Sequence, residues 1–284
     1  MWVLFHKHCL DGTASASAVV KKFENVRVFP ISHGYSQDEI EEILSTKNDT
    51  IYVVDFSLKR SDFEKLLLNG NRVIHIDHHI TAKDEIEALE KAYSNFESIF
   101  NLQHSAAYLS WDYLFGDVPK LIKIIEDRDL WKKEYPETDI VCYYLFSKVL
   151  DKPQELLNLI EEPISSLYEK GLGIKEYIDS SIDQTLKKIE PIWLEFGGFL
   201  RKRFRIPAVN SNTYLSELGN ELAKKYDGLG CVYYITGEEV KLSFRSVEGS
   251  KVNAQEVATF LGGGGHPHAA GARISLKKFI KMLK

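Results

Sequence analysis

The stretch Arg72-Val73-Ile74-His75-Ile76-Asp77-His78-His79 decides the fold of this chain. Its first five residues predict a buried strand, because branched apolar side chains dominate them. The strand ends on a carboxylate and two imidazoles, those of Asp77, His78 and His79. In open α/β folds, ligands bind outside the carboxyl ends of the strands. The stretch therefore predicts an α/β fold with a functional site at that edge of a sheet.

Two other predicted strands end on side chains of the same kind. Trp2-Val3-Leu4-Phe5 is followed by His6 and, a few residues later, by Asp11, and Ile51-Tyr52-Val53-Val54 is followed by Asp55. Imidazole nitrogens and carboxylate oxygens both bind divalent cations. A single histidine or aspartate after a strand is more often structural, but three strands that end this way indicate a shared metal site. The sequence therefore predicts a metal-dependent hydrolase.

The rest of the pattern predicts two α/β regions joined by helices. Up to about residue 135, short apolar runs alternate with amphipathic stretches, as in βαβ units with a parallel sheet. We expect a helix over 13–23 with Thr13 as its N-cap, and a helix over 36–44 that opens on a capping box.

The expected boundaries follow from where the pattern changes. They are a parallel-sheet catalytic domain over 1–138, a helical connector over 139–190, and a smaller mixed α/β substrate-binding domain over 191–284.

Composition limits the partners of this chain. Of its 284 residues, 44% are hydrophobic and 27% charged, as in soluble globular proteins. No apolar run is long enough to cross a membrane, so no membrane partner is expected. Three widely separated cysteines, Cys9, Cys142 and Cys231, argue against a disulfide framework and favour the cytoplasm.

Charge argues against one kind of nucleic-acid binding. The net charge of −5 disfavours sequence-independent binding along duplexes, which needs many phosphate contacts. The basic cluster Arg201-Lys202-Arg203-Phe204-Arg205 fits either a solvated strand edge or a patch that contacts phosphates.

Five motifs in this order resemble those of the DHH phosphoesterase superfamily. They are His6 to Gly12, Asp55, the triplet at 77–79, Glu126 to Asp129 before Leu130-Trp131, and Gly262 to His266. The last is similar to the signature of the DHH-associated C-terminal domain. The superfamily includes RecJ-type exonucleases, nano-RNases, cyclic-dinucleotide phosphodiesterases and exopolyphosphatases.

The resemblance implies two bound divalent cations. The expected metal ligands are His6, Asp11, Asp55, His78 and Asp129, with Asp55 as the bridge because its strand should lie between the other two. His79 is expected to face the scissile phosphate, and Asp77 to orient an imidazole. Mixed carboxylate and imidazole donors favour Mn²⁺, with Mg²⁺ as the alternative.

Two points stay open within the metal ligands. Most members of the superfamily have an aspartate where this chain has Cys9, so the thiol is either a packing residue or a soft ligand that favours iron or zinc. His8 is either a substitute ligand or a surface residue. Asp127 competes with Asp129 as a ligand, and the spacing to Trp131 favours Asp129.

The resemblance also implies a set of substrate-binding residues. Arg245 is expected to clamp one phosphate through its guanidinium group, and His266 to bind another. Glycines allow backbone N–H groups to approach an anion closely. The expected substrate-binding residues are therefore Arg245, Gly263, Gly264, Gly265 and His266.

We therefore expect an Mn²⁺-dependent phosphodiesterase that cleaves short single-stranded oligonucleotides or dinucleotides to mononucleotides. The alternatives are a cyclic-dinucleotide phosphodiesterase, an exopolyphosphatase, or a catalytically weakened nucleotide-binding protein. RNA or DNA preference, cleavage polarity and oligomeric state, a homodimer included, are left open.

Overall fold

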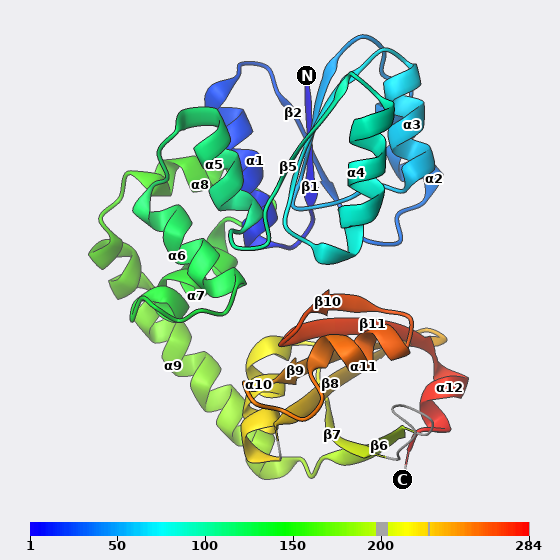
Figure 1. The fold of residues 1–284 in the computed structure, drawn as a ribbon. Coiled ribbons are helices and arrows are strands. Elements are labelled where there is room, and N and C mark those ends of the chain that lie inside the picture. The colour runs from blue at the N-terminus through cyan, green and yellow to red at the C-terminus, as the bar shows by residue number, and fades with distance from the viewer. Residues whose placement is uncertain (197–203, 227, 284) are drawn as a thin grey trace. The chain divides into compact units, whose positions relative to one another are not determined.

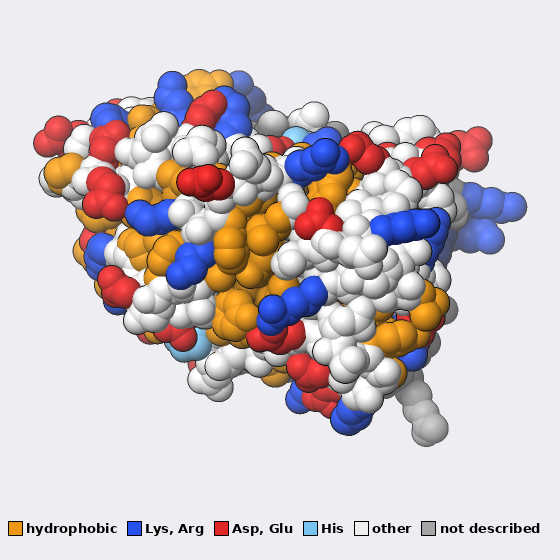
Figure 2. Space-filling model, turned by 90° about the horizontal axis from the view of Figure 1, so that it is seen from above, with side chains coloured by type: hydrophobic (Ala, Val, Ile, Leu, Met, Phe, Trp, Pro, Cys, Tyr) orange, Lys and Arg blue, Asp and Glu red, His pale blue; other side chains and the backbone are white. Residues whose placement is uncertain are grey.

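The computed structural model describes residues 1–196, 204–226 and 228–283, which form two compact units, Met1–Lys175 and Glu176–Lys284 (Figure 1). Of the basic cluster, Arg201, Lys202 and Arg203 lie outside the described residues. Among the residues that are described, every helix is too short or too polar to cross a membrane. Acidic and basic side chains are interspersed on the face shown in Figure 2.

The first unit is built on the parallel sheet that the sequence predicts. Its strands are β1 (Trp2–His6), β2 (Arg27–Ile31), β3 (Thr50–Val54), β4 (Arg72–Asp77) and β5 (Phe96–Phe100), in the order β2-β1-β3-β4-β5. All four pairings are parallel. The strand order reverses its direction between β1 and β3, and ligands bind at such a switch point in folds of this kind. β3 lies between β1 and β4, as expected.

Side chains alternate between two cores, one on each face of this sheet. The helices are α1 (Leu10–Lys22), α2 (Gln37–Leu44), α3 (Arg60–Leu68), η1 (Ile80–Ala82), α4 (Lys83–Ala92), α5 (Ala106–Phe115) and α6 (Lys120–Asp129). Val3 and Phe5 pack with α1, α5 and α6, whereas Trp2 and Leu4 pack with α2, α3 and α4. Because both faces are covered, the carboxyl edge of the sheet is the part left for a site.

The segment expected as a connector divides between the two units. It forms α7 (Thr138–Lys148), α8 (Pro153–Ile160) and α9 (Ile164–Lys188). Val141, Leu145 and Leu156 are fully buried in the same core as α1 and α5, so α7 and α8 are part of the first unit. The boundary between the units falls within α9, at Lys175.

The start of α1 differs from the expectation. The N-cap is Cys9, whose backbone is extended and whose Sγ accepts a hydrogen bond from the N–H of Gly12. Thr13 is instead inside the helix, and its Oγ1 donates to the carbonyl of Cys9 (2.8 Å). The capping box of α2 is confirmed, since Ser36 and Glu39 each accept a hydrogen bond from the other's backbone N–H.

The second unit contains a mixed sheet of six strands in the order β10-β11-β9-β8-β7-β6. The pair β7–β8 is parallel and the other pairings are antiparallel. The strands are β6 (Ile192–Phe196), β7 (Phe204–Asn210), β8 (Leu229–Thr236), β9 (Glu239–Ser246), β10 (Gly264–His266) and β11 (Ala269–Ser275). The helices are α10 (Leu215–Lys225), α11 (Ala254–Phe260) and α12 (Leu276–Ile280). The fold class is therefore the expected one: a parallel-sheet unit followed by a smaller mixed α/β unit.

Candidate metal centre

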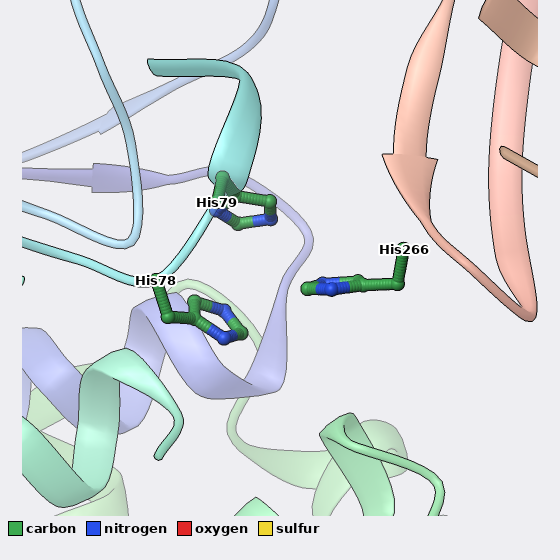
Figure 3. Close-up of side chains that lie close together, drawn as sticks. All are labelled: His78, His79 and His266. Atoms are coloured by element: carbon green, nitrogen blue, oxygen red, sulfur yellow. The ribbon is translucent and has the colours of Figure 1, made fainter. Parts of the chain in front are cut away.

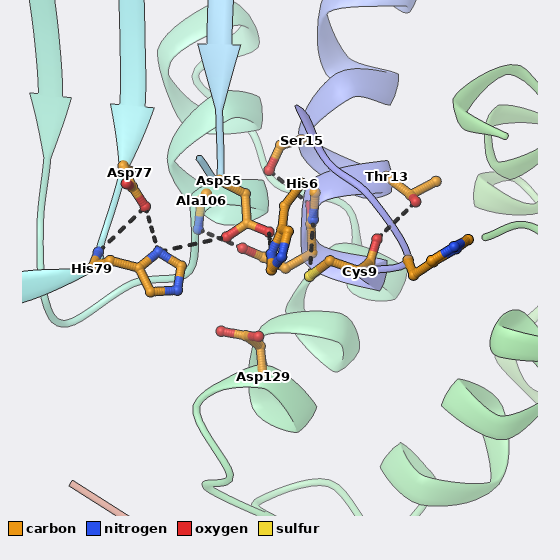
Figure 4. A network of polar contacts seen from close by, with 12 residues as sticks. His6, Cys9, Thr13, Ser15, Asp55, Asp77, His79, Ala106 and Asp129 are labelled. Carbon is orange, nitrogen blue, oxygen red and sulfur yellow. Dashed lines mark hydrogen bonds and ion pairs between the residues drawn. The ribbon is translucent and has the colours of Figure 1, made fainter. Parts of the chain in front are cut away.

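Asp55 lies at the centre of the polar cluster at the carboxyl edge of the first sheet (Figure 4). It follows β3 with a φ of 52°, a left-handed conformation that aspartate tolerates better than most residues. Its side chain is 1% exposed. Oδ2 lies 3.6 Å from Nδ1 of His6, and Oδ1 lies 3.6 Å from Nε2 of His78 and 3.9 Å from Nδ1 of His79. The two oxygens therefore face different histidines.

Gly12 allows α1 to start next to these residues. A Cβ at this position would lie 2.6 Å from the carbonyl oxygen of His6 and 3.1 Å from Oδ2 of Asp55. A side chain here would therefore push α1 away from the ends of β1 and β3. Close packing therefore requires a glycine at this position of the first motif, whether or not a ligand is bound.

Asp11 reaches the cluster from the first turn of α1. Its carboxylate is buried and accepts hydrogen bonds from the backbone N–H groups of Ala106 (2.9 Å) and Ala107 (3.1 Å). These groups belong to the first turn of α5, whose N-terminus favours a negative charge. Oδ2 of Asp11 also lies 3.8 Å from Nε2 of His78. The same histidine therefore faces both Asp11 and Asp55.

Asp129 and Asp127 have different surroundings. Oδ2 of Asp129 lies 3.5 Å from Nε2 of His78, at the C-terminus of α6. Asp127 instead accepts hydrogen bonds from the backbone of the following loop and from a threonine hydroxyl, namely from Glu134 N (2.8 Å), Tyr135 N (3.3 Å) and Thr138 Oγ1. Asp129 therefore lies beside His78, whereas Asp127 holds the loop that follows α6.

Asp77 fixes the orientation of the second histidine of the triplet. Its Oδ1 lies 2.7 Å from Nδ1 of His79 and accepts a hydrogen bond from the backbone N–H of His78 (2.8 Å). Figure 3 shows the imidazoles of His78 and His79, which follow β4. Asp77 therefore fixes the ring of His79 through Nδ1.

Three residues for which the sequence pattern predicts no role support Asp77. Ser57 donates a hydrogen bond to Oδ2 of Asp77 (3.1 Å), and its Oγ lies 2.9 Å from Nε2 of His75. Nδ1 of His75 lies 3.3 Å from the hydroxyl of Ser98 on β5. His75 is fully buried. The signal that could have found it is a polar residue in the middle of an otherwise apolar strand.

His8 and Cys9 are the residues of the first motif whose roles the sequence leaves undecided, and they differ in exposure. His8 is exposed, and its Nδ1 and backbone N–H both lie 2.7 Å from carboxylate oxygens of Asp151. This places it as a surface residue rather than a ligand. Cys9 is half-buried, and its Sγ belongs to a group with ligand atoms of His6 and Asp55 that all lie within 4.8 Å of one another.

Burial and, after it, mutual repulsion raise the pKa values of two acidic groups of the cluster. Burial, and then the negative charges of Asp55 and Asp129, raise the pKa of Asp11 well above its ordinary value. Burial also raises the pKa of Asp129, with a further contribution from Asp55. Burial alone would raise the pKa of Asp55, but His6 and His78 hold it below the ordinary value. The thiol of Cys9 has a raised pKa because of its burial and the carboxylates around it.

The two histidines of the triplet are shifted in the opposite sense. Burial disfavours the charged imidazolium, but Asp55, Asp129 and Asp11 raise the pKa of His78 to about 10. For His79, burial is likewise outweighed, and the charge and hydrogen bond of Asp77 raise its pKa to about 9. Without a cation, positive charge at the centre therefore comes from these imidazoles.

The donor set fits divalent cations. Oδ2 of Asp55 and Oδ2 of Asp129 are buried, yet they accept no hydrogen bond from the described part of the chain. Buried carboxylate oxygens normally have a donor or a metal partner. Ligand atoms of Asp11, His78 and Asp129 lie within 4.8 Å of one another, as do those of His6, Cys9 and Asp55. The cluster therefore offers two adjoining groups of donors, with Asp55 between them.

The second unit brings Arg245 and His266 onto one row of its sheet. Ala269 of β11 pairs with Arg245 of β9 on one side and with His266 of β10 on the other. Side chains in register on neighbouring strands point to the same face, and two strand spacings amount to about 10 Å. Arg245 donates to the hydroxyls of Ser243 (3.1 Å) and Ser216 (2.7 Å), which hold its guanidinium in place. The methyl group of Ala269 therefore lies between the side chains of Arg245 and His266, both of which can bind anions.

The glycines before His266 have a packing reason as well. Gly264 and Gly265 pair with Gly271 and Ala270 in the hairpin of β10 and β11. A Cβ at Gly263 would lie 2.0 Å from the carbonyl oxygen of Gly271, and Gly265 has a φ of 137°. Two of the expected anion-binding glycines are thus required by the hairpin itself. Their role toward a substrate stays a prediction.

His268, to which the sequence assigned no role, stabilises the same hairpin. Its Nδ1 lies 3.1 Å from Oγ of Ser246, and its carbonyl accepts a hydrogen bond from the backbone N–H of Ser246. Ser246 also accepts from the backbone N–H of Ala254 (3.1 Å) in the first turn of α11. The turn at residues 266–268 is therefore tied to both β9 and α11.

Comparisons with known proteins agree with these features. The family model of the DHHA1 domain matches residues 204–284. An uncharacterized protein, R106, of Acanthamoeba polyphaga mimivirus is 26% identical over 96% of this chain and 67% of its own length. Oligoribonuclease NrnB of Bacillus subtilis (strain 168) is 23% identical over 97% of this chain and 73% of its own length.

A solved structure is similar in fold. RecJ in complex with Mn²⁺ from Thermus thermophilus aligns with a TM-score of 0.54 and 12% identity, over 99% of this chain and 50% of the RecJ chain. The chain thus spans about half the length of that protein. The fold is that of an α/β protein of two units, with a cluster of residues that could bind metal at the carboxyl edge of its first sheet. Residues 204–284 match the DHHA1 domain, and the chain is similar over nearly its whole length to oligoribonuclease NrnB, which agrees with the resemblance to the DHH phosphoesterase superfamily.

The contrast between Asp127 and Asp129 can be tested with matched substitutions. Asp127→Asn should lower the free energy of unfolding by roughly 2–3 kcal/mol, because the loop loses charge-assisted hydrogen bonds, and should leave Mn²⁺ affinity unchanged. Asp129→Asn should weaken Mn²⁺ binding without loss of stability in the metal-free protein, because it removes one of several repelling charges. Urea unfolding and the electron paramagnetic resonance signal of free Mn²⁺ report the two quantities. The assignment would be contradicted if Asp127→Asn weakened Mn²⁺ binding and Asp129→Asn lowered the free energy of unfolding.

The stability of the metal-free protein should fall at alkaline pH. The pKa of His79 is raised to about 9, so its imidazolium stabilises the folded state fully below the ordinary pKa of about 6.5. This contribution is lost as the pH rises through about 9. Urea midpoints measured between about pH 7 and 10 should therefore decrease. The decrease should be smaller in Asp77→Asn, and a flat profile in the unmodified protein would contradict the pairing.

Proposed function

We propose that this chain is a divalent-cation-dependent phosphodiesterase that hydrolyses short single-stranded oligonucleotides to mononucleotides. One observation carries the proposal: carboxylates and imidazoles from β1, α1, β3, β4 and α6 converge at one edge of the sheet, and the two oxygens of Asp55 face different histidines. The name of the NrnB relative, an oligoribonuclease, supports the substrate class. Cytoplasmic location, expected from the three free cysteines, is part of the same proposal.

The residues present fit a pair of cations. In the proposal, His6 and Asp55 would hold the first cation, and Asp55 would also hold the second, together with Asp11, His78 and Asp129. When bound, such a pair neutralises phosphoryl oxygens and makes a water acidic enough to attack at neutral pH. Carboxylate and imidazole donors suit Mn²⁺, the cation with which the RecJ structure is in complex, and Mg²⁺ is the alternative.

The remaining residues of the triplet act on the phosphate in this proposal. Asp77 holds the Nδ1 proton of His79, so Nε2 is the atom that can donate to a phosphoryl oxygen. The raised pKa of His79 keeps that donor protonated at neutral pH in the metal-free protein. Ser57 keeps Asp77 in place through its hydrogen bond to Oδ2, and His75 in turn contacts the hydroxyl of Ser57. His79 thus contributes charge, and Asp77 contributes orientation.

The second unit has the task of holding the substrate in this proposal. Arg245 and His266 lie on one row of the sheet, and two strand spacings of about 10 Å suit groups that bind separate parts of one nucleotide chain. The glycines at 263–265 allow the backbone to come close to an anion. A short substrate needs few contacts of this kind, which agrees with the low net charge of the chain.

A panel of substrates tests the proposal. With Mn²⁺, the protein should release mononucleotides faster from di- to tetranucleotides than from long single strands, a cyclic dinucleotide or polyphosphate. Asp55→Asn is the matched control, because asparagine keeps the shape and tolerates the left-handed backbone. This variant should retain less than about a tenth of the activity, since both cations lose a ligand. Faster cleavage of the cyclic dinucleotide or of polyphosphate would replace the proposed substrate. Binding of nucleotides without turnover would indicate a nucleotide-binding protein instead.

A second prediction separates binding from chemistry. Arg245→Ala should raise KM and leave kcat nearly unchanged, because the guanidinium is proposed to grip a phosphate away from the bond that breaks. Arg245→Lys should restore part of the affinity, since it keeps the charge but not the fork that contacts Ser216 and Ser243. Steady-state kinetics with a trinucleotide measure both constants. A loss confined to kcat would place Arg245 at the reacting phosphate.

A further inference from the structure

Cys9 is an unusual N-cap residue. It precedes α1, and its Sγ accepts a hydrogen bond from the backbone N–H of Gly12 at 3.5 Å. A serine or aspartate is a much stronger N-cap than a thiol. The capping contact alone therefore gives no reason for sulfur at this position. The residue needs another explanation.

The sulfur lies among donors that suit a cation. Sγ of Cys9, an imidazole nitrogen of His6 and a carboxylate oxygen of Asp55 all lie within 4.8 Å of one another (Figure 4). One imidazole, one thiol and one carboxylate thus surround one point.

A second observation concerns Asp55 alone. Its side chain is 1% exposed, its Oδ2 is directed toward His6 at 3.6 Å, and that oxygen accepts no hydrogen bond from the described residues. A buried carboxylate oxygen without a donor points to a ligand at this place. The same oxygen belongs to the group of donors that includes Cys9.

We propose that Cys9 is a thiolate ligand, and that the His6–Cys9–Asp55 group binds Zn²⁺ in preference to Mn²⁺ or Mg²⁺. The inference rests on the proposed cation pair for the place of Asp55. Sulfur is a soft donor that Mg²⁺ and Mn²⁺ bind poorly, whereas Zn²⁺ takes sulfur, imidazole and carboxylate together. On binding, the S–H bond breaks, its proton passes to solvent, and a sulfur–metal bond forms.

The proposal makes the two cation positions unlike each other. The second group, formed by Asp11, His78 and Asp129, offers two carboxylates and one imidazole and contains no sulfur. Oxygen-rich donors favour harder cations such as Mn²⁺. Asp55 would therefore connect a soft position to a hard one.

Cobalt absorption tests the sulfur ligand directly. Co²⁺ replaces Zn²⁺ in such sites, and a cobalt–thiolate bond gives an intense charge-transfer band in the near ultraviolet. Titration of the metal-free protein with CoCl₂ under anaerobic conditions should produce this band to saturation at one sulfur-bound ion per chain. Addition of ZnCl₂ should remove it. The band should be absent in Cys9→Ser, which keeps an N-cap and a similar size, and circular dichroism confirms that this variant is folded.

Two further variants complete the experiment. Cys142→Ala is the matched control. Cys142 is fully buried in the core of the first unit, so its substitution should leave the band unchanged. Cys9→Asp replaces sulfur by a carboxylate and should raise Mn²⁺ affinity at this position, because oxygen is the harder donor; the signal of free Mn²⁺ measures the change.

The outcomes separate this inference from the proposed function. Binding of Co²⁺ to the unmodified protein without the charge-transfer band would overturn the role of Cys9 and leave the cation pair in place. A band that persists in Cys9→Ser would also overturn it. Failure of the unmodified protein to bind Co²⁺, Zn²⁺ or Mn²⁺ at all would overturn the proposed metal centre, and this inference with it.

Discussion

Repulsion between the carboxylates of Asp11, Asp55 and Asp129 is the constraint on which the first unit depends. Two of them are buried and the third largely so, and all three lie around the imidazole of His78. Like charges in such a place are costly unless each has a compensating partner. The N-terminus of α5 supplies N–H groups to Asp11, and His6 and His78 face Asp55. The positions of several elements thus follow from one electrostatic problem.

The sequence was sufficient for the strands that position the centre. β1, β3 and β4 are buried on both faces, so each is a short apolar run that ends abruptly on a polar residue. Such runs can be recognised without a structure, and their order, with β3 in the middle, follows from the position of Asp55 in the motif pattern. The capping box of α2 was equally recognisable, because both of its side chains act locally.

Other features depend on contacts that no local pattern contains. β5 lies at the edge of the sheet and is only partly buried, so its sequence resembles a loop. The support of Asp77 by Ser57 and His75 joins residues about twenty positions apart. Cys9 as an N-cap was missed because threonine is the stronger capping residue by propensity, whereas the position of α1 is set by the approach of Gly12 to His6 and Asp55.

The glycine run before His266 has a consequence for how such chains diverge. Since Gly263 leaves no room for a side chain against the carbonyl of Gly271, and Gly265 has a positive φ, the run must stay whatever molecule occupies the face above it. A pattern search that relies on these glycines therefore recognises the shared fold but does not distinguish chains by their substrate preference. Chains with different preferences can carry the same fingerprint and differ in the side chains that flank Arg245.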